Sequence, residues 1–141
     1  MKFIFLFAAL VVLSSPACAN PARLQRLQST FENFEAGFAW LKHCGDFKKS
    51  LAEKPFYMAN AQLVVVALDK EITVEHPQIT PQQAQQMIFA RRQAIQSAFD
   101  AVYGKGGCGT PQAEAAKKQV DLFGSASPEK INDFLKTIEN L

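Results

Sequence analysis

At four points after residue 19, proline follows a residue that can cap a helix, and this recurring pair predicts a mostly helical fold. Proline is tolerated in the first turn of a helix, where its missing N–H loses no partner, and Ser, Thr or Asn before it can cap the exposed amides. Thr80 and Gln83 also form a capping box. Pro55 indicates a fifth helix start, although Lys54 is a poor cap. The four pairs are Asn20-Pro21, Thr80-Pro81, Thr110-Pro111 and Ser127-Pro128.

Residues 1–19 have the composition of a secretory signal peptide. They carry one lysine, an apolar run, and the small residues Ala17 and Ala19 before Asn20. The apolar run is too short to span a bilayer. We therefore expect cleavage after Ala19, export to the periplasm or the extracellular space, and a single helical domain over residues 20–141.

The three cysteines allow two processing routes. Cys18 could become the lipid-bearing first residue of a lipoprotein, but Ser15 stands where bacterial lipoprotein signals usually carry leucine. Either route leaves Cys44 and Cys108, and an even number of cysteines in an oxidising compartment predicts one disulfide. Closing a loop of about 65 residues would contribute roughly 4 kcal/mol on the chain-entropy model.

A metal site is the alternative interpretation of Cys44, because His43 precedes it. His76 is the only other histidine, and no paired-ligand spacing supports a site. We therefore expect neither a metal nor another cofactor.

The segment 21–43 places apolar residues at alternating steps of three and four, which forms a continuous seam on one face of a helix. A homodimeric coiled coil through residues 24–41 is one interpretation. Because the seam covers fewer than three heptads, we favour one side of an intramolecular bundle. The seam consists of Leu24, Leu27, Phe31, Phe34, Phe38 and Leu41.

The next segment, from Pro55 to Leu68, contains no charged residue and allows two interpretations. A hairpin over residues 63–75 is favoured by three consecutive valines, but Asp69-Lys70 lacks the Gly or Asn of a tight turn. A helix ending near Val74 would have a wide apolar surface, as in a central helix covered by neighbours. Its apolar stripe would contain Met58, Ala61, Val65, Leu68 and Ile72.

The expected disulfide favours the helical interpretation. Three long helices running up, down and up would bring Cys44 and Cys108 to the same end of a bundle. The third helix is expected over 81–103, with Gly104 as its C-cap. We therefore predict an all-α, up-down bundle of about five helices with one disulfide, and keep α+β as the alternative. The remaining elements are a short helical turn starting at Asp46 and helices over 111–123 and 128–140.

Trp40 lies on the face of the first helix opposite the apolar seam. One explanation is that the two C-terminal helices cover this face and make the first helix central. The functional explanation is that Trp40, above a notch at Gly37 and beside Asn33, anchors a partner, because exposed aromatic residues often dominate binding energy.

Arg91 falls in the middle of the apolar arc of the third helix, between Ile88 and Ile95. A buried guanidinium needs a charged or carbonyl partner. We expect a structural pairing, with Glu35 as the candidate partner, and keep the alternative that Arg91 anchors an anionic ligand in an apolar pocket.

Charge and motif content exclude several function classes. The formal charge is +2 and falls closer to zero without Lys2, so nucleic acid and anionic membranes are not expected partners. No nucleophile with a matching base is recognisable, and GKGGCG follows a helix, whereas a phosphate loop follows a strand. We therefore expect no enzyme activity.

Two function classes remain. The first is an exported protein-binding module, such as an inhibitor, an immunity protein or a chaperone, and it is the one we favour. The second is a carrier of a small apolar or amphipathic ligand, for which the phenylalanines, Met58, Met87 and Arg91 would form a pocket.

Overall fold

The computed structural model describes residues 20–141, so the expected signal peptide and Cys18 lie outside the described residues. Within this range the chain forms six α-helices and one 3-10 turn, without strands. The predicted all-α fold is confirmed, and the hairpin alternative at 63–75 is wrong because these residues are helical. The elements are α1 (Pro21–His43), α2 (Phe47–Glu53), α3 (Tyr57–Glu75), α4 (Pro81–Gly106), η1 (Gly107–Gly109), α5 (Pro111–Ser125) and α6 (Pro128–Glu139).

The helix starts lie where the capping pairs predict them. The Asn20 side chain accepts a hydrogen bond from the N–H of Ala22, and Thr110 does the same for Ala113. Thr80 forms the complete capping box with Gln83. α1, α4, α5 and α6 all begin at the proline that follows the cap.

Two predicted boundaries are wrong. α3 begins at Tyr57 rather than at Pro55, and Phe56 before it makes no side-chain cap. α4 continues through Gly104 and ends only before Gly107, whose φ of 66° lies in the left-handed region that favours glycine. The backbone geometry at Gly107, rather than the first glycine in the run, therefore ends the helix.

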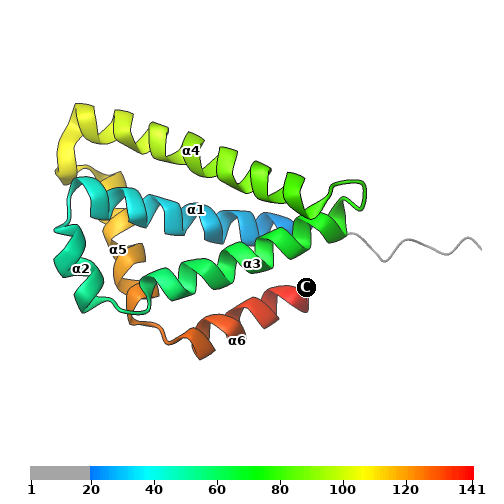
Figure 1. Ribbon diagram of the computed structural model, residues 1–141. Coiled ribbons are helices and arrows are strands. Elements are labelled where there is room, and N and C mark those ends of the chain that lie inside the picture. Colours follow the sequence, from blue (N-terminus) through cyan, green and yellow to red (C-terminus); the bar gives the residue numbers. More distant parts are fainter. Residues whose placement is uncertain (1–19) are drawn as a thin grey trace, which may run out of the picture.

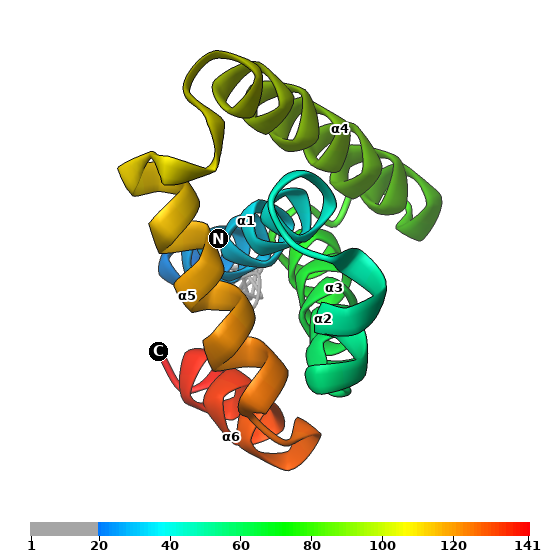
Figure 2. The same ribbon diagram turned by 90° about the vertical axis from the view of Figure 1, so that its left-hand side faces the viewer.

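The three long helices α1, α3 and α4 lie side by side and alternate in direction, as Figure 1 shows. Figure 2, turned by 90°, shows α5 crossing α1 on the side away from α4, with α6 below. α1 contacts α3, α4 and α5, so it is the central helix of the bundle. The expected cover of the back of the first helix is thus partly present: α5 packs on α1, but Asn33 on that face stays exposed.

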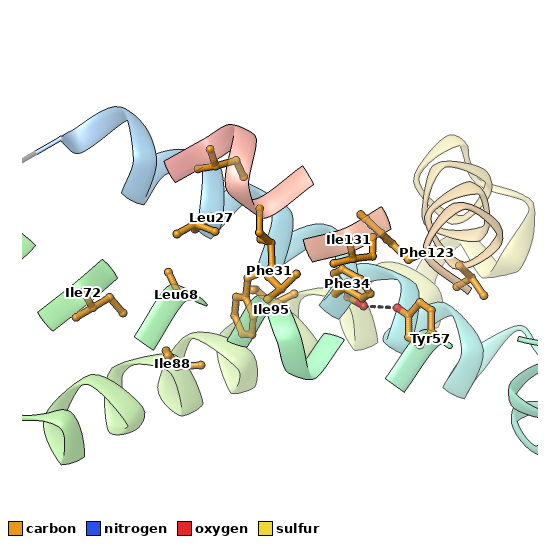
Figure 3. Close-up of a cluster of buried hydrophobic side chains, with 14 of the residues drawn as sticks. Leu27, Phe31, Phe34, Tyr57, Leu68, Ile72, Ile88, Ile95, Phe123 and Ile131 are labelled. Atoms are coloured by element: carbon orange, nitrogen blue, oxygen red, sulfur yellow. Dashed lines mark hydrogen bonds between the residues drawn. The ribbon is translucent and has the colours of Figure 1, made fainter. Parts of the chain in front are cut away.

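The predicted seam of α1 forms much of the core. Leu27, Phe31, Phe34 and Leu41 are buried, while Leu24 and Phe38 pack at its edge. Figure 3 shows several of these side chains meeting residues of α3, α4, α5 and α6. A dimer through residues 24–41 would have to open this intramolecular packing.

α3 buries only part of the predicted stripe: Leu68 and Ile72 are buried, Ala61 and Val65 are partly buried against the core, and Met58 is exposed. Its buried residues are Tyr57, Asn60, Val64, Leu68, Glu71 and Ile72, whereas Met58 and Val66 are exposed. The reason is that α1, rather than α3, occupies the centre, so α3 has one covered side and one open side. Asn60 donates to the carbonyls of Phe123 and Ala126 at 2.7 and 2.8 Å, which ties α3 to the end of α5.

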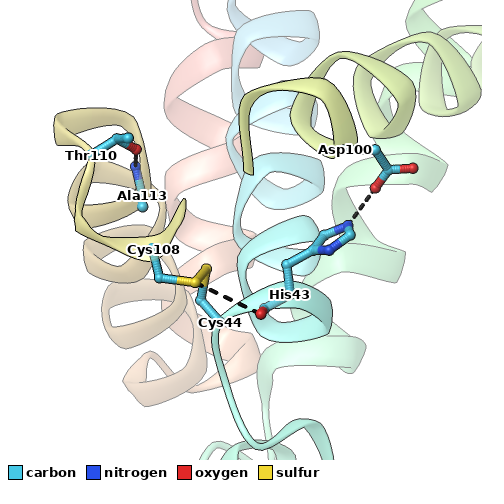
Figure 4. The surroundings of a disulfide bond; sticks show 6 residues. All are labelled: His43, Cys44, Asp100, Cys108, Thr110 and Ala113. Atoms are coloured by element: carbon cyan, nitrogen blue, oxygen red, sulfur yellow. Dashed lines mark hydrogen bonds and ion pairs between the residues drawn. A yellow bond between two sulfur atoms is a disulfide. The ribbon is translucent and has the colours of Figure 1, made fainter. Parts of the chain in front are cut away.

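The predicted disulfide is present. Cys44 follows α1, Cys108 lies in η1 after α4, and their Cα atoms are 5.5 Å apart. Figure 4 shows the bond joining the two segments at one end of the bundle. None of the helices within residues 20–141 has both the length and the apolar character needed to cross a membrane.

Candidate functional site

The three residues predicted to bind a partner lie in different environments. Gly37 is buried, and a Cβ added to it would lie 2.5 Å from the Tyr57 hydroxyl. That hydroxyl therefore fills the notch, and it donates to the carbonyl of Phe34 at 2.5 Å. Trp40 is partly buried against the core, and Asn33 is exposed. The α1 surface around Trp40 thus lacks the open notch that the sequence suggests.

Burial also affects the acidity of Tyr57. Desolvation raises the pKa of its hydroxyl, and the charge of Glu35 raises it further. Tyr57 therefore stays protonated and acts as a hydrogen-bond donor. Its role is structural, because the proton is committed to the Phe34 carbonyl.

The predicted pairing of Arg91 with Glu35 is wrong. Arg91 is exposed, and its Nε donates to Glu32 at 3.0 Å. Glu35 instead accepts from the neighbouring Arg92 at 2.7 Å and from Gln96 at 3.1 Å. The buried carboxylate of α1 is therefore held by the residue one step further along α4.

The open side of α3 and the adjacent face of α4 form a groove. Two hollows, of about 210 and 310 Å³, adjoin there and share Gln62, Val65 and Arg92 in their walls. We call them together the α3–α4 groove. From Met58 to Asp69 the groove follows about 16 Å of α3, at 1.5 Å per residue. Its other lining residues include Phe38, Ala61, Val66, Gln85, Ile88 and Phe89.

Large apolar side chains border the groove and face solvent. Met58 is 50% exposed, and Val66 and Phe89 are each 57% exposed. Single exposed apolar residues are common on protein surfaces, but an apolar patch around a groove is typical of a binding site. The groove therefore gathers exposed apolar groups from two helices on one surface.

The polar residues of the groove are few. Arg92 is paired with Glu35, and Gln62 and Gln85 are uncharged. Asp69 also lines the groove, and one of its carboxylate oxygens is buried without a hydrogen-bond partner within residues 20–141. That oxygen is covered by the chain itself, so a cationic group of a partner would pair with the Asp69 carboxylate through its other oxygen.

A second cavity lies between α1, α3 and α4. It has a volume of about 500 Å³, its floor contains Phe31, Leu68 and Ile72, and Met87 and Arg91 also line it. Three residues of the predicted ligand pocket, Phe31, Met87 and Arg91, are thus brought together, whereas Met58 lies in the α3–α4 groove. Arg91 is already paired with Glu32, which also lines the cavity.

The disulfide end of the bundle carries a histidine–carboxylate contact. His43 lies within hydrogen-bond distance of Asp100, and Lys42 is 3.7 Å from the same oxygen. The hydrogen bond to His43 is the main reason that the pKa of Asp100 is lowered. Within residues 20–141 no hydroxyl or thiol hydrogen-bonds to the His43 ring or the Asp100 carboxylate. The nearby cysteines form the disulfide, and the Tyr103 ring packs against the imidazole with its centroid 5.4 Å away. These residues also contain no group of three His, Cys, Asp or Glu side chains placed to hold a metal ion.

Comparison of this chain with protein-family models, curated proteins and solved structures finds no match. The choice between functions therefore depends on the chain's own geometry. Sequence reasoning missed Val66 and Phe89 as exposed groove residues. One feature of the sequence could have indicated them: Val66 and Phe89 lie in the uncharged segments 55–68 and 78–90, which form neighbouring helices.

Proposed function

We propose that this chain is an exported protein-binding module that holds an amphipathic helix of a partner protein in the α3–α4 groove. The observation that carries the proposal is the exposure of Met58, Val66 and Phe89 around one groove between two helices. Helix-in-groove recognition uses an apolar face with anchors at i, i+3 or i+4, and i+7. A groove of about 16 Å accommodates about three turns of such a helix.

The charges of the groove specify the partner further. Arg92 is neutralised by Glu35, so Asp69 is the acidic group of the groove without an ion pair within residues 20–141. A lysine or arginine at one end of the partner's apolar face would supply the cation. We therefore expect a helix that is apolar along one side, poor in acidic residues, and basic at the end that lies beside Asp69.

The features that indicate export are consistent with this proposal. The disulfide is compatible with an oxidising compartment. Together with the predicted signal peptide at residues 1–19, it favours a partner in the periplasm or the extracellular space. The binding module would then act on another exported protein, as an inhibitor, immunity protein or chaperone does.

Site-specific crosslinking in the native host tests the proposal. A photoreactive phenylalanine analogue replaces Val66 or Phe89 in the groove, and Leu122 serves as the control because it is 61% exposed on α5, outside the groove. We expect both groove positions, and not position 122, to crosslink to one helix of one exported protein. Crosslinks to a second copy of this chain, or equal crosslinking at position 122, would refute the proposal.

A synthetic peptide of the crosslinked helix then gives the affinity. Phe89→Ala should weaken binding at least tenfold, because exposed aromatic anchors carry much of the binding energy. Leu122→Ala should leave the affinity unchanged. Both substitutions remove an exposed side chain, so each variant should keep its stability within about 0.5 kcal/mol.

A small-ligand carrier is the second candidate, and the cavity of about 500 Å³ between α1, α3 and α4 favours it. Its size and apolar floor suit a small amphipathic molecule. Native mass spectrometry of the mature protein from the exported fraction tests this function. A carrier would have an added mass of a few hundred daltons, which Met87→Glu should remove and Leu122→Glu should retain.

A further inference from the structure

The backbone nitrogen of Asn20 lies at the predicted cleavage point and makes a long-range contact. It donates a hydrogen bond to the side chain of Glu75, the last residue of α3. The Asn20 side chain at the same time caps α1 by accepting from Ala22 at 3.1 Å. The first residue of the expected mature chain is therefore attached to a carboxylate 55 positions further along.

We propose that signal-peptide cleavage converts this hydrogen bond into an ion pair, and that Glu75 is the binding site for the α-amino group of the mature chain. A signal peptidase would add water across the Ala19–Asn20 peptide bond. The hydroxyl goes to the Ala19 carbonyl carbon, and a proton goes to the Asn20 nitrogen. Ionisation of the new carboxyl group supplies the second proton, so an ammonium group forms beside Glu75. The proposal depends on cleavage after Ala19 and is independent of the α3–α4 groove.

Glu75 belongs to a cluster around Glu71 that contains more acidic than basic groups. The carboxyl group of Glu71 feels the charges of Glu75 and Glu139, and the basic groups Arg23 and Lys70 act on it as well. Lys70 is 3.4 Å from Glu139. Three carboxylates therefore face two cations, and the ammonium group of the mature chain supplies the third positive charge.

The dipole of α1 disfavours a positive charge at Asn20. The N-terminus of α1 carries a partial positive charge, so an ammonium group at its N-cap is unfavourable by itself. The Glu75 carboxylate offsets this effect, because it lies next to the same nitrogen. Cleavage therefore stabilises the folded domain only if Glu75 accepts the new charge.

The pKa of the α-amino group tests the proposal directly. The mature protein is purified from the exported fraction, its first residue is identified by N-terminal sequencing, and the amine is titrated by NMR. We expect Asn20 as the first residue and an amine pKa about half a unit or more above the usual 7.7–8.0. Glu75→Gln should return the pKa to that range, because the amide carries no charge.

Glu53→Gln is the matched control, since Glu53 lies in α2, which follows the opposite end of α1. It should leave the amine pKa unchanged. Selective acetylation of the α-amino group should lower the melting temperature of the unsubstituted protein by about 1–4 °C, as expected for loss of one partly exposed ion pair. A different first residue, an amine pKa insensitive to Glu75→Gln, or a melting temperature raised by acetylation would each overturn the proposal.

Discussion

Gly37 lies in the middle of α1, where alanine would be the better helix former by about 1 kcal/mol. A methyl group there would meet the Tyr57 hydroxyl at 2.5 Å and a Val120 methyl group at 3.1 Å. Because Tyr57 is buried and donates to Phe34, its hydroxyl cannot move away freely. We expect Gly37→Ala to lower the free energy of unfolding by about 1–2 kcal/mol, since overpacking outweighs helix propensity.

Tyr57→Phe provides the control for this prediction. It removes the hydroxyl that collides with the new methyl group, so the double variant should recover most of the loss caused by Gly37→Ala. Urea unfolding of the four proteins gives the coupling energy directly. If Gly37→Ala alone stabilised the protein, the close contact with Tyr57 would not explain the glycine.

The buried carboxyl group of Glu71 should make the stability of the protein depend on pH. Burial raises the pKa of its carboxyl group, with Arg23 opposing and Glu75 reinforcing the shift. A raised folded-state pKa means that the folded protein binds more protons than the unfolded chain. The contribution of Glu71 to stability is therefore fully present at low pH and decreases as the pH rises through the window above the unfolded value of about 4.3.

Glu71→Gln should remove this pH dependence. At pH 7 the variant should be more stable by up to about 1 kcal/mol, because it no longer buries a charge with one unpaired oxygen. The gain should vanish near pH 4. Urea unfolding between pH 4 and 8 measures both effects, and equal pH profiles for the two proteins would contradict the prediction.

Arg91 shows where residue-level reasoning from sequence ends. Helical periodicity placed it in the middle of the apolar arc of α4 with Glu35 as its partner, but Arg91 is exposed and Glu35 lies one helical turn from its actual partner. The structure pairs Arg91 with Glu32 and Arg92 with Glu35. Neighbouring residues differ by about 100° around a helix, and long arginine side chains span much of that difference. The pairing then depends on the relative position of the two helices, which no local pattern encodes.

At the scale of elements, local chemistry predicted helix starts better than helix ends. Asn20, Thr80 and Thr110 cap the amides that their sequence pattern indicates. Gly104 was a plausible stop, but glycine is also tolerated inside a helix. The run from Gly104 to Gly109 offered several stops, and the disulfide to Cys44 requires the chain to turn close to Cys108.

The two glycines Gly104 and Gly107 make a matched pair of tests. Gly104 lies inside α4, and a Cβ there would meet nothing within 4 Å. Gly104→Ala should therefore stabilise the protein by about 0.5–1 kcal/mol through helix propensity. Gly107 has a φ of 66° and a ψ of −166°, a conformation close to glycine-only. Gly107→Ala should destabilise it by about 1–3 kcal/mol.

Thermal unfolding of both variants checks this pair. The opposite signs are the essential result, because both substitutions add the same methyl group within one short segment. A loss of stability in Gly104→Ala would mean that α4 ends at Gly104 in solution, as the sequence pattern alone predicts.

At the scale of the whole molecule, the open side of α3 follows from which helix occupies the centre. The apolar stripe through Met58 and Val65 indicated a covered helix, and α3 could have been central on its composition alone. In the structure α5 crosses α1 instead (Figure 2), so α1 is surrounded. Met58, Ala61 and Val65 of the stripe then line the groove, while Leu68 and Ile72 are buried. The sequence predicted the helices and the disulfide, but the exposure of Met58, Val66 and Phe89 depends on this choice of packing partner.

The disulfide also limits how the helices can pack, because it joins the end of α1 to the turn that follows α4. The closed loop contains α2, α3 and α4, and therefore both walls of the groove. Cys108 is exposed and Cys44 is partly buried, so replacing both with alanine removes little packing. The double variant Cys44→Ala/Cys108→Ala should lose roughly 3–4 kcal/mol of stability, as loop-closure entropy predicts.

Urea unfolding of the oxidised protein, the reduced protein and the double variant separates the cross-link from the side chains. Reduced protein and double variant should unfold at the same lower urea concentration, because both lack only the bond. Amide exchange should rise most in the last turns of α4, near Tyr103, since the disulfide holds that end of α4 against α1. Equal unfolding midpoints for oxidised and reduced protein would mean that packing of Tyr103 and Ala113 around Ala39 already closes the loop without the bond.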